Sequence, residues 1–398
     1  MAMNQTPAAE RVHISFFGRR NAGKSSIINA VTGQNLAIVS DVKGTTTDPV
    51  YKTMELLPLG PAMLIDTPGI DDEGELGALR VQKTSETIPK ADIALLVCSE
   101  ENLTLERIWS AKLKDAGVKQ IAVISKADIQ DPAPLAEAIM RELGMQPIIV
   151  SAKTQTGIPE LLTALARAVP ESHGSHPILG GLANPGDTVL LVMTQDSAAP
   201  KGRLILPQVQ TIRELLDTGC VSINATPETL DAALSALHAP PALIITDSQV
   251  FREVYEKTPK QSKLTSFSVL FAAHKGDITA FVEGARAVDQ LNETSRILIA
   301  EACTHAPVTE DIGRVKIPAM LRKKFGAGLQ IDHVSGTDFP TVLDDYDLVI
   351  HCGGCMFNRT YLLSRVQQAR SAGVPITNYG VLIAKMKGIL DKVSLPEA

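Results

Sequence analysis

The octapeptide GRRNAGKS, from Gly18 to Ser25, constrains the fold of this chain more than any other feature of its 398 residues. It follows the apolar run 14–17 and precedes an apolar helical pattern, which is the strand, loop and helix order of a phosphate-binding P-loop. Glycines at both ends allow backbone N–H groups to curl around a phosphate, Lys24 can reach the phosphate oxygens, and Ser25 can offer a hydroxyl to Mg²⁺. The sequence therefore predicts a nucleotide site in an α/β domain.

The rest of the chain extends this α/β pattern. Apolar runs alternate with helical periods up to residue 169, which is the spacing of a doubly wound parallel sheet. Two stretches have the composition of a boundary, one rich in Gly, Pro, Ser and Asn at 171–187 and one polar around Pro259. We expect an N-terminal P-loop domain with a doubly wound sheet at 1–172, followed by two smaller α/β domains at 186–260 and 264–398. The middle domain is predicted to contain strands at 189–193 and 243–246.

Two loops with threonine and aspartate follow the P-loop. The motif DTPG ends an apolar strand, where Asp66 can hold Mg²⁺ through water and the Gly69 amide can sense a γ-phosphate. Upstream, GTTTDP places threonines in a loop, of which Thr46 is the favoured Mg²⁺ ligand. Both loops would order around a triphosphate and relax after hydrolysis. We therefore predict Mg²⁺ ligands at Ser25, Thr46 and Asp66, and catalytic roles for Lys24, Thr46 and Gly69.

Two short motifs indicate that the base of the bound nucleotide is guanine. In SKAD, the Asp128 carboxylate can accept hydrogen bonds from the N1–H and N2–H₂ groups of guanine, which adenine lacks, and SAK places the Ala152 amide near guanine O6. Either motif is weak alone, but five ordered motifs at strand ends, where doubly wound folds bind ligands, favour a GTP site. The predicted GTP-contacting residues are Asn21, Ala22, Gly23, Lys24, Ser25, Ser26, Thr45, Thr46, Asp66, Gly69, Lys126, Asp128, Ser151, Ala152 and Lys153.

The motifs GRRNAGKS, GTTTDP, DTPG, SKAD and SAK resemble the Era and TrmE branch of GTPases. The resemblance implies GTP hydrolysis with Mg²⁺, and Asn21 matches an asparagine that helps to hold K⁺ in potassium-stimulated members, although a loop asparagine can also cap its own backbone. Ile70 stands where Ras-like proteins carry a water-orienting glutamine, so we expect slow hydrolysis that K⁺ stimulates more than Na⁺. Ser125 replaces the usual Asn or Thr, and we expect it to weaken the support beneath Asp128.

Three of the five cysteines lie in the last quarter of the chain, in patterns that suit a metal. EACTH follows a predicted strand at 296–300 and HCGGC follows one at 348–350, and in a parallel sheet both motifs would emerge at one edge. Thiolates select zinc or an iron–sulfur cluster. Zinc could take three cysteines and a histidine, whereas a 4Fe-4S cluster could use the three cysteines with one iron exchangeable or weakly held. The candidate ligands are Cys303, Cys352 and Cys355, with His305, His351 or Glu301 as the fourth group.

The order C-x-H, 45 residues, then H-C-x-x-C, behind a P-loop domain and a middle domain, resembles the FeFe-hydrogenase maturation GTPases, the HydF family. The resemblance covers essentially the whole chain. It implies a 4Fe-4S cluster on the three cysteines, a homodimer formed through the middle domain, and a scaffold or carrier role for the diiron subcluster precursor. It also implies two radical-SAM maturases and the apo FeFe-hydrogenase as partners.

The composition argues against several classes of protein. An excess of acidic over basic residues, 44 against 38, argues against a protein that coats nucleic acid or anionic membranes. The few cysteines exclude a disulfide framework, and the chain shows no apolar signal core or membrane-spanning run, so we expect a cytoplasmic protein without nucleic-acid or membrane partners. Two rivals stay open: an RNA- or ribosome-associated GTPase with a structural zinc domain, and a redox protein that uses Cys352 and Cys355 as a dithiol. Cys98 and Cys220 are predicted to be core residues.

Overall fold

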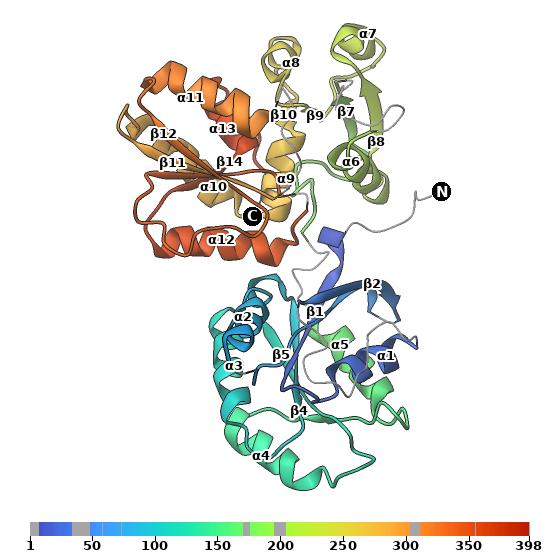
Figure 1. Ribbon diagram of the computed structural model, residues 1–398. Helices are drawn as coiled ribbons and strands as arrows, with labels where there is room; N and C mark the ends of the chain where they lie inside the picture. The colour runs from blue at the N-terminus through green and yellow to red at the C-terminus, as the bar shows by residue number, and fades with distance from the viewer. Residues whose placement is uncertain are drawn as a thin grey trace. The chain divides into compact units, whose positions relative to one another are not determined.

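The computed structural model describes residues 8–33, 48–57, 59–72, 74–169, 176–194, 204–302, 311–354 and 356–397. The chain divides into two compact units, 1–174 and 175–398, and each is described by itself. Both are built from sheets that are wholly or mostly parallel and are covered by helices (Figure 1). None of the helices in the described ranges is both long enough and apolar enough to cross a membrane.

The first unit contains a six-stranded sheet in the order β2-β3-β1-β4-β5-β6, in which β2 runs antiparallel to its neighbour and the other pairs are parallel. Its strands are β1 Val12–Gly18, β2 Val50–Leu56, β3 Gly60–Asp66, β4 Ile93–Cys98, β5 Lys119–Ile124 and β6 Ile148–Ile149. Its helices are α1 Lys24–Thr32, α2 Gly74–Ser85, α3 Thr104–Asp115, α4 Ala133–Leu143 and α5 Ile158–Ala168, with short 3₁₀ turns at Ala8–Glu10 and Ile88–Lys90.

Both faces of this sheet are buried, as a doubly wound fold requires. Ile14 and Phe16 of β1 pack on one face with residues of α1 and α5, whereas Phe17 packs on the other with Trp109 of α3 and residues of α4. The period of two along β1 sends successive side chains to opposite faces, so the whole strand is buried. The predicted doubly wound sheet is therefore confirmed, and its parallel strands end at one edge, where the P-loop and the later motifs follow.

The second unit contains two four-stranded parallel sheets, β10-β9-β7-β8 and β12-β11-β13-β14. The first is formed by β7 Thr188–Val192, β8 Val221–Ala225, β9 Leu243–Thr246 and β10 Lys263–Ser266, with α6 Leu206–Asp217, α7 Leu230–Ser235, α8 Phe251–Lys257 and α9 Phe267–Lys275. The second is formed by β11 Arg296–Glu301, β12 Gln330–Ser335, β13 Leu348–His351 and β14 Ile376–Asn378, with α10 Ile278–Ala287, α11 Ile317–Phe325, α12 Arg359–Ser371 and α13 Tyr379–Met386. Shorter turns complete the unit: η3 Pro227–Thr229, η4 Val288–Gln290, η6 Leu390–Lys392 and the π-helical η5 Ile312–Lys316.

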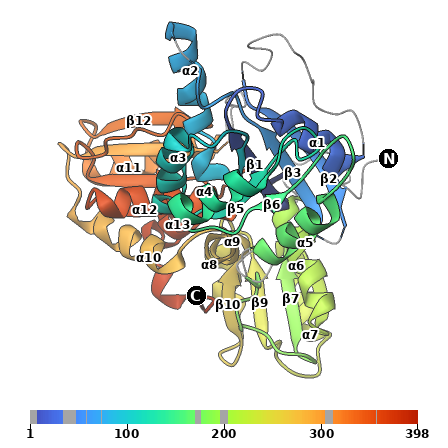
Figure 2. The same cartoon turned by 90° about the horizontal axis from the view of Figure 1, so that it is seen from below.

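One hydrophobic core joins these two sheets. Leu190 and Ile244 of the first sheet belong to the same buried cluster as Leu298 and Val349 of the second. Helix α9 lies between the sheets (Figures 1 and 2) and contributes Val269 and Ala272 to this cluster. Residues 175–398 therefore form one continuous unit, in which the segment expected to begin at residue 264 starts inside β10.

The first of these sheets has twice the strands that the sequence predicts for the middle segment. The predicted strands correspond to β7 and β9, whose residues are nearly all buried and apolar. The other two strands, β8 and β10, lie at the edges of the sheet and carry serine, threonine, asparagine or lysine. Edge strands bury less apolar surface, so hydrophobic pattern alone does not reveal them.

Candidate functional site

The P-loop connects β1 to α1 through a tight turn. Asn21 adopts a φ of 58° and Gly23 a φ of 94°, left-handed conformations that glycine and asparagine tolerate best. Lys24 is buried, and its ammonium group donates to the carbonyl oxygens of Gly18 and Arg19, each at 2.8 Å. Burial lowers the pKa of Lys24 to about 8. A bound phosphate would favour the charged form, because an opposite charge nearby raises the pKa of an amine.

The predicted Mg²⁺ ligands Ser25 and Asp66 are in direct contact. The Ser25 hydroxyl donates to Asp66 Oδ2 at 2.6 Å, and Asp66 is the last residue of β3. Burial raises the pKa of the Asp66 carboxyl, which a cation at this point would reverse. A serine hydroxyl beside a buried carboxylate supplies the hard oxygen ligands that Mg²⁺ prefers. The two side chains therefore fit a magnesium site.

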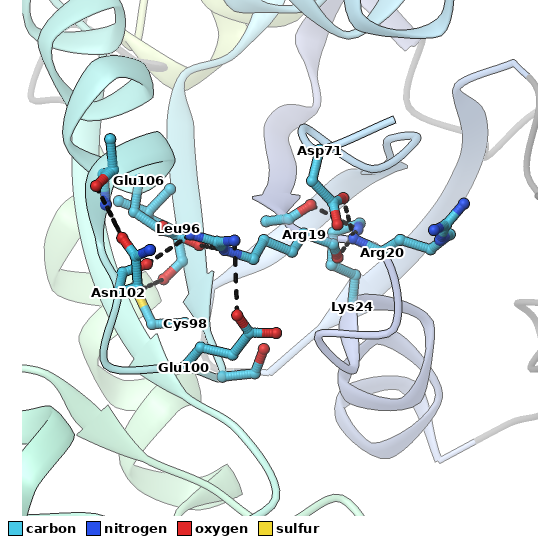
Figure 3. A network of polar contacts seen from close by, with 12 residues as sticks. Arg19, Arg20, Lys24, Asp71, Leu96, Cys98, Glu100, Asn102 and Glu106 are labelled. Carbon is cyan, nitrogen blue, oxygen red and sulfur yellow. Dashed lines mark hydrogen bonds and ion pairs between the residues drawn. The ribbon is translucent and has the colours of Figure 1, made fainter. Parts of the chain in front are cut away.

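Two arginines tie the P-loop to neighbouring segments (Figure 3). Arg19 Nε donates to Glu106 Oε1 of α3 at 2.8 Å. The backbone N–H of Arg20 donates to Asp71 Oδ1 at 2.6 Å, and its guanidinium pairs with Asp72 at 3.4 Å. The loop after DTPG is thus held to the P-loop by carboxylates. The sequence does not reveal these contacts, because RR and DD show opposite charges in the two motifs but not that the motifs touch.

Gly69 and Ile70 lie directly against the P-loop. A Cβ at Gly69 would come within 2.9 Å of the Arg20 nitrogen, so only glycine fits there. The Ile70 N–H donates to the Gly18 carbonyl at 3.3 Å, and the Ile70 side chain is buried in the same cluster as Phe17. A buried isoleucine has no polar group to orient water, which supports the expectation of slow hydrolysis.

The two guanine motifs are connected to the rest of the site through serines. The Ser125 hydroxyl donates to the Ala22 carbonyl at 2.6 Å, which ties the SKAD loop to the P-loop. The Ser151 hydroxyl donates to Asp128 Oδ1 at 2.7 Å and holds the pKa of that carboxyl below its usual range. Asp128 is exposed, so its ionised carboxylate is open to a base. The weaker guanine affinity expected from Ser125 stays a prediction.

The described members of the predicted GTP site lie together at the carboxyl edge of the first sheet or in the first turn of α1. They are Asn21, Ala22, Gly23, Lys24, Ser25, Ser26, Asp66, Gly69, Lys126, Asp128, Ser151, Ala152 and Lys153. Thr45 and Thr46 lie outside the described residues, so the GTP contacts predicted for both, and the Mg²⁺ and catalytic roles predicted for Thr46, stay predictions.

The cysteine motifs follow neighbouring strands of the second unit. In the register of β11 and β13, Ala300 pairs with His351, and the strands run parallel. The segments that follow them therefore leave the sheet at one edge, as the sequence predicts. Cys303, His305 and Cys355 lie outside the described residues. Among the residues that the structure does describe, no group of three potential metal ligands gathers, and the complete ligand set stays a prediction.

Cys352 has the surroundings of a thiolate ligand. Its Sγ accepts hydrogen bonds from the backbone N–H groups of Ala302 at 3.0 Å and Gly354 at 3.4 Å. Backbone amides that point at a sulfur stabilise negative charge on it and tune a bound cluster. A Cβ at Gly353, the next residue, would meet nothing within 4 Å, so the loop leaves open space at that residue. These features fit a soft metal group, whereas Cys98 and Cys220 are buried, as predicted.

Both ring nitrogens of His351 are engaged within the protein. Arg365 Nη1 lies 2.9 Å from His351 Nε2, and His351 Nδ1 lies 2.8 Å from the Cys352 carbonyl oxygen. Because a guanidinium only donates, Nε2 is the acceptor and Nδ1–H donates to the carbonyl. Burial and the Arg365 charge lower the pKa of His351 to about 3, in keeping with a neutral ring. A role as metal ligand, which stays a prediction, would require the bond to Arg365 to break.

Glu301, the other candidate at this edge, is also engaged. Tyr379 donates to Glu301 Oε1 at 3.1 Å, and Arg314 Nε donates to Glu301 Oε2 at 3.2 Å. Its side chain is only 8% exposed. Arg314 lies in η5, directly after the segment that contains Cys303 and His305. Glu301 thus links the end of β11 to η5.

Comparison with known families divides the chain into three matched regions. A model described as "Hydrogen maturase F dimerization domain" matches residues 178–276, and one described as "Hydrogen maturase F tetramerization domain" matches residues 279–396. A model described as "50S ribosome-binding GTPase" matches residues 13–126, which contain the P-loop, DTPG and the start of SKAD.

Individual relatives match the first part of the chain. The tRNA modification GTPase MnmE of Endomicrobium trichonymphae is 32% identical over 192 residues, which cover 47% of this chain and 41% of that protein. MnmE of Paraburkholderia xenovorans is 34% identical over 160 residues, which cover 40% and 34%. The chain therefore spans less than half the length of these relatives. Among solved structures, Era in complex with MgGDPNP and a fragment of 16S ribosomal RNA shows 18% identity and a TM-score of 0.38, over 55% of this chain and 92% of that one.

Proposed function

Because the chain belongs to the hydrogen maturase F family, whose two domain models match residues 178–276 and 279–396 behind a GTPase domain, we propose that it hydrolyses GTP and carries the diiron subcluster precursor for FeFe-hydrogenase on a 4Fe-4S domain. The GTPase domain occupies the first unit. The proposed cluster ligands are Cys303, Cys352 and Cys355, at the edge of the second.

The observation that carries the cluster assignment is the environment of Cys352. Its sulfur accepts two backbone N–H groups at the end of β13, next to the end of β11 from which the segment with Cys303 departs. A bound cluster would supply an iron with an exchangeable position, which suits a carrier. The protein's own part is to present the thiolates, to stabilise their charge with amides, and to leave space beside Gly353.

We also propose roles for the residues of the GTP site. Lys24 would exchange its bonds to the carbonyls of Gly18 and Arg19 for bonds to phosphate oxygens. Asp66 and Ser25 would hold Mg²⁺, and Asp128 would select guanine. Since the Ile70 side chain has no polar group that could align water, hydrolysis is slow. The slow reaction serves as a switch for partner binding or release.

We propose that K⁺ supplies positive charge beside the phosphates. Asn21 is exposed in the P-loop turn, where its side chain can hold a cation beside the phosphates. We expect hydrolysis in KCl to exceed that in NaCl of equal ionic strength by at least about tenfold, the effect of roughly 1.4 kcal/mol on the barrier. Asn21→Gly should remove the difference, because glycine keeps the positive φ and loses only the amide. Equal wild-type rates in both salts would refute the potassium site.

The assembly proposed for the chain is a homodimer formed through residues 178–276, in line with the dimerization model that matches them. The tetramerization model that matches residues 279–396 supports a further level of assembly. Two radical-SAM maturases and the apo FeFe-hydrogenase are the proposed partners.

A transfer assay tests the carrier role. The chain, expressed anaerobically with the two maturases and then purified, is mixed with FeFe-hydrogenase that lacks its diiron subcluster. Hydrogen evolution should appear, and it should be absent when the chain was expressed without the maturases. Failure of the loaded chain to activate the hydrogenase, with iron still bound to it, would contradict the carrier role.

A further inference from the structure

Arg365 is a charged side chain held inside an aromatic box. It lies on α12, is only 2% exposed, and its guanidinium stacks on Phe339, Phe357 and Tyr361 at 4.6 to 4.8 Å from the ring centroids. Aromatic faces attract a cation but carry no net charge. The box therefore orients the guanidinium without neutralising it.

The hydrogen bonds of Arg365 do not neutralise it either. Its nitrogens donate to His351 Nε2, to the Gly336 carbonyl and to the Tyr361 hydroxyl, and its Nε has no partner among the residues that the structure describes. No described carboxylate forms an ion pair with it; burial lowers the pKa of Arg365, and only Tyr361, the Cys352 thiol and Asp338 among the described residues act in the opposite direction. A buried charge without a counter-charge is costly, so proteins rarely retain one unless an anion completes the site.

A chain of contacts leads from this charge to the cysteine edge. Arg365 donates to His351, His351 Nδ1–H donates to the Cys352 carbonyl, and the Cys352 sulfur accepts amides of its own loop. Phe357, one face of the box, donates its N–H to Gly354 in the same loop. Arg365 thus fixes the loop on which the thiolate is placed.

We propose that Arg365 is the buried counter-charge of the cluster site, a positioning residue that stabilises the additional electron of the reduced cluster and holds His351 outside the ligand set. This rests on the proposed function, since it needs a cluster on Cys303, Cys352 and Cys355. A fixed positive charge in a water-excluded site lowers the free energy of the more negative state. The reduced cluster and an anionic cargo are both favoured by it.

The test is the one-electron reduction of the anaerobically reconstituted full-length chain by dithionite, followed by EPR in a mediated redox titration. Arg365→Met should lower the equilibrium constant for reduction by at least about tenfold, which is 59 mV for a one-electron couple. Arg365→Lys keeps the charge and should stay near the wild-type potential. Arg370→Met is the matched control, because it removes a positive charge from the same helix, where Arg370 is paired with Asp277 and partly exposed.

Each outcome of these measurements supports or refutes the role proposed for Arg365. A wild-type chain that binds no iron refutes the proposed function and this inference with it. A loaded wild type with the same potential as Arg365→Met, or an Arg370→Met shift of equal size, refutes the inference alone. If Arg365→Met fails to load a cluster, Arg365→Lys decides: loading with a wild-type potential supports a role for charge, and failure to load assigns Arg365 to packing only and overturns the inference.

Discussion

Replacing Cys352 by alanine is expected to reduce the iron bound per chain at least about tenfold, because removing one of only three thiolates leaves too few ligands for a 4Fe-4S cluster. Cys303→Ala and Cys355→Ala should behave alike. Hydrolysis of GTP should stay within about twofold of wild type in all three variants, because the P-loop and the cysteine motifs belong to different compact units. Iron analysis and a GTPase assay on the same anaerobic preparation measure the loss of iron and the retained hydrolysis.

Cys220→Ala is the matched control. Cys220 is a buried cysteine of the same unit whose thiol donates to the Asn184 carbonyl at 3.2 Å, far along the chain from the cluster motifs. The control should keep its iron. Full iron content in Cys352→Ala, or equal loss in Cys220→Ala, would contradict the ligand assignment.

Lys24→Ala is expected to lower GTP hydrolysis by about 10²–10³-fold, the usual effect of removing one preorganised charge-stabilising donor. The ammonium group is buried in the P-loop and donates to the carbonyl oxygens of Gly18 and Arg19. Iron content should not change, since the cluster edge belongs to the other unit. Initial rates at saturating GTP and Mg²⁺, with binding measured separately, distinguish lost chemistry from lost affinity.

Lys114→Ala provides the comparison for this variant. Lys114 is an exposed lysine in the last turn of α3, and its loss should leave hydrolysis unchanged. If Lys24→Ala hydrolysed GTP at the wild-type rate, the P-loop would not be the catalytic site and the GTPase assignment would fail.

The fold of the first unit follows from the sequence because its strands are buried on both faces. Continuous apolar strands such as β4, followed by motifs at their carboxyl ends, predict a doubly wound sheet with the motifs at one edge. The edge strands β8 and β10 were missed for the converse reason, since half of their side chains are polar. The single core that joins the two sheets of the second unit also has no sequence signature, because it depends on how α9 packs between them.

The residues of the candidate site also divide into those that the sequence locates and those that it does not. Motifs locate the groups that we propose to touch a ligand, such as Lys24, Asp128 and Cys352, because ligand chemistry demands particular residues at particular spacings. They do not locate groups that act through another residue. Arg365 stands 14 residues after His351 on a helix, where an arginine is ordinarily solvated, and only the packing of Phe339 and Phe357 around it reveals the buried charge.

The proposed function depends most on the nature of the metal group at the edge formed by β11 and β13. Anaerobic purification of the wild-type chain after reconstitution with iron and sulfide, followed by metal and acid-labile sulfide analysis with an absorption spectrum, measures it directly. A 4Fe-4S cluster predicts a brown protein with about four iron and four sulfide per chain. A colourless protein with one zinc and no sulfide would contradict it and favour a structural zinc domain.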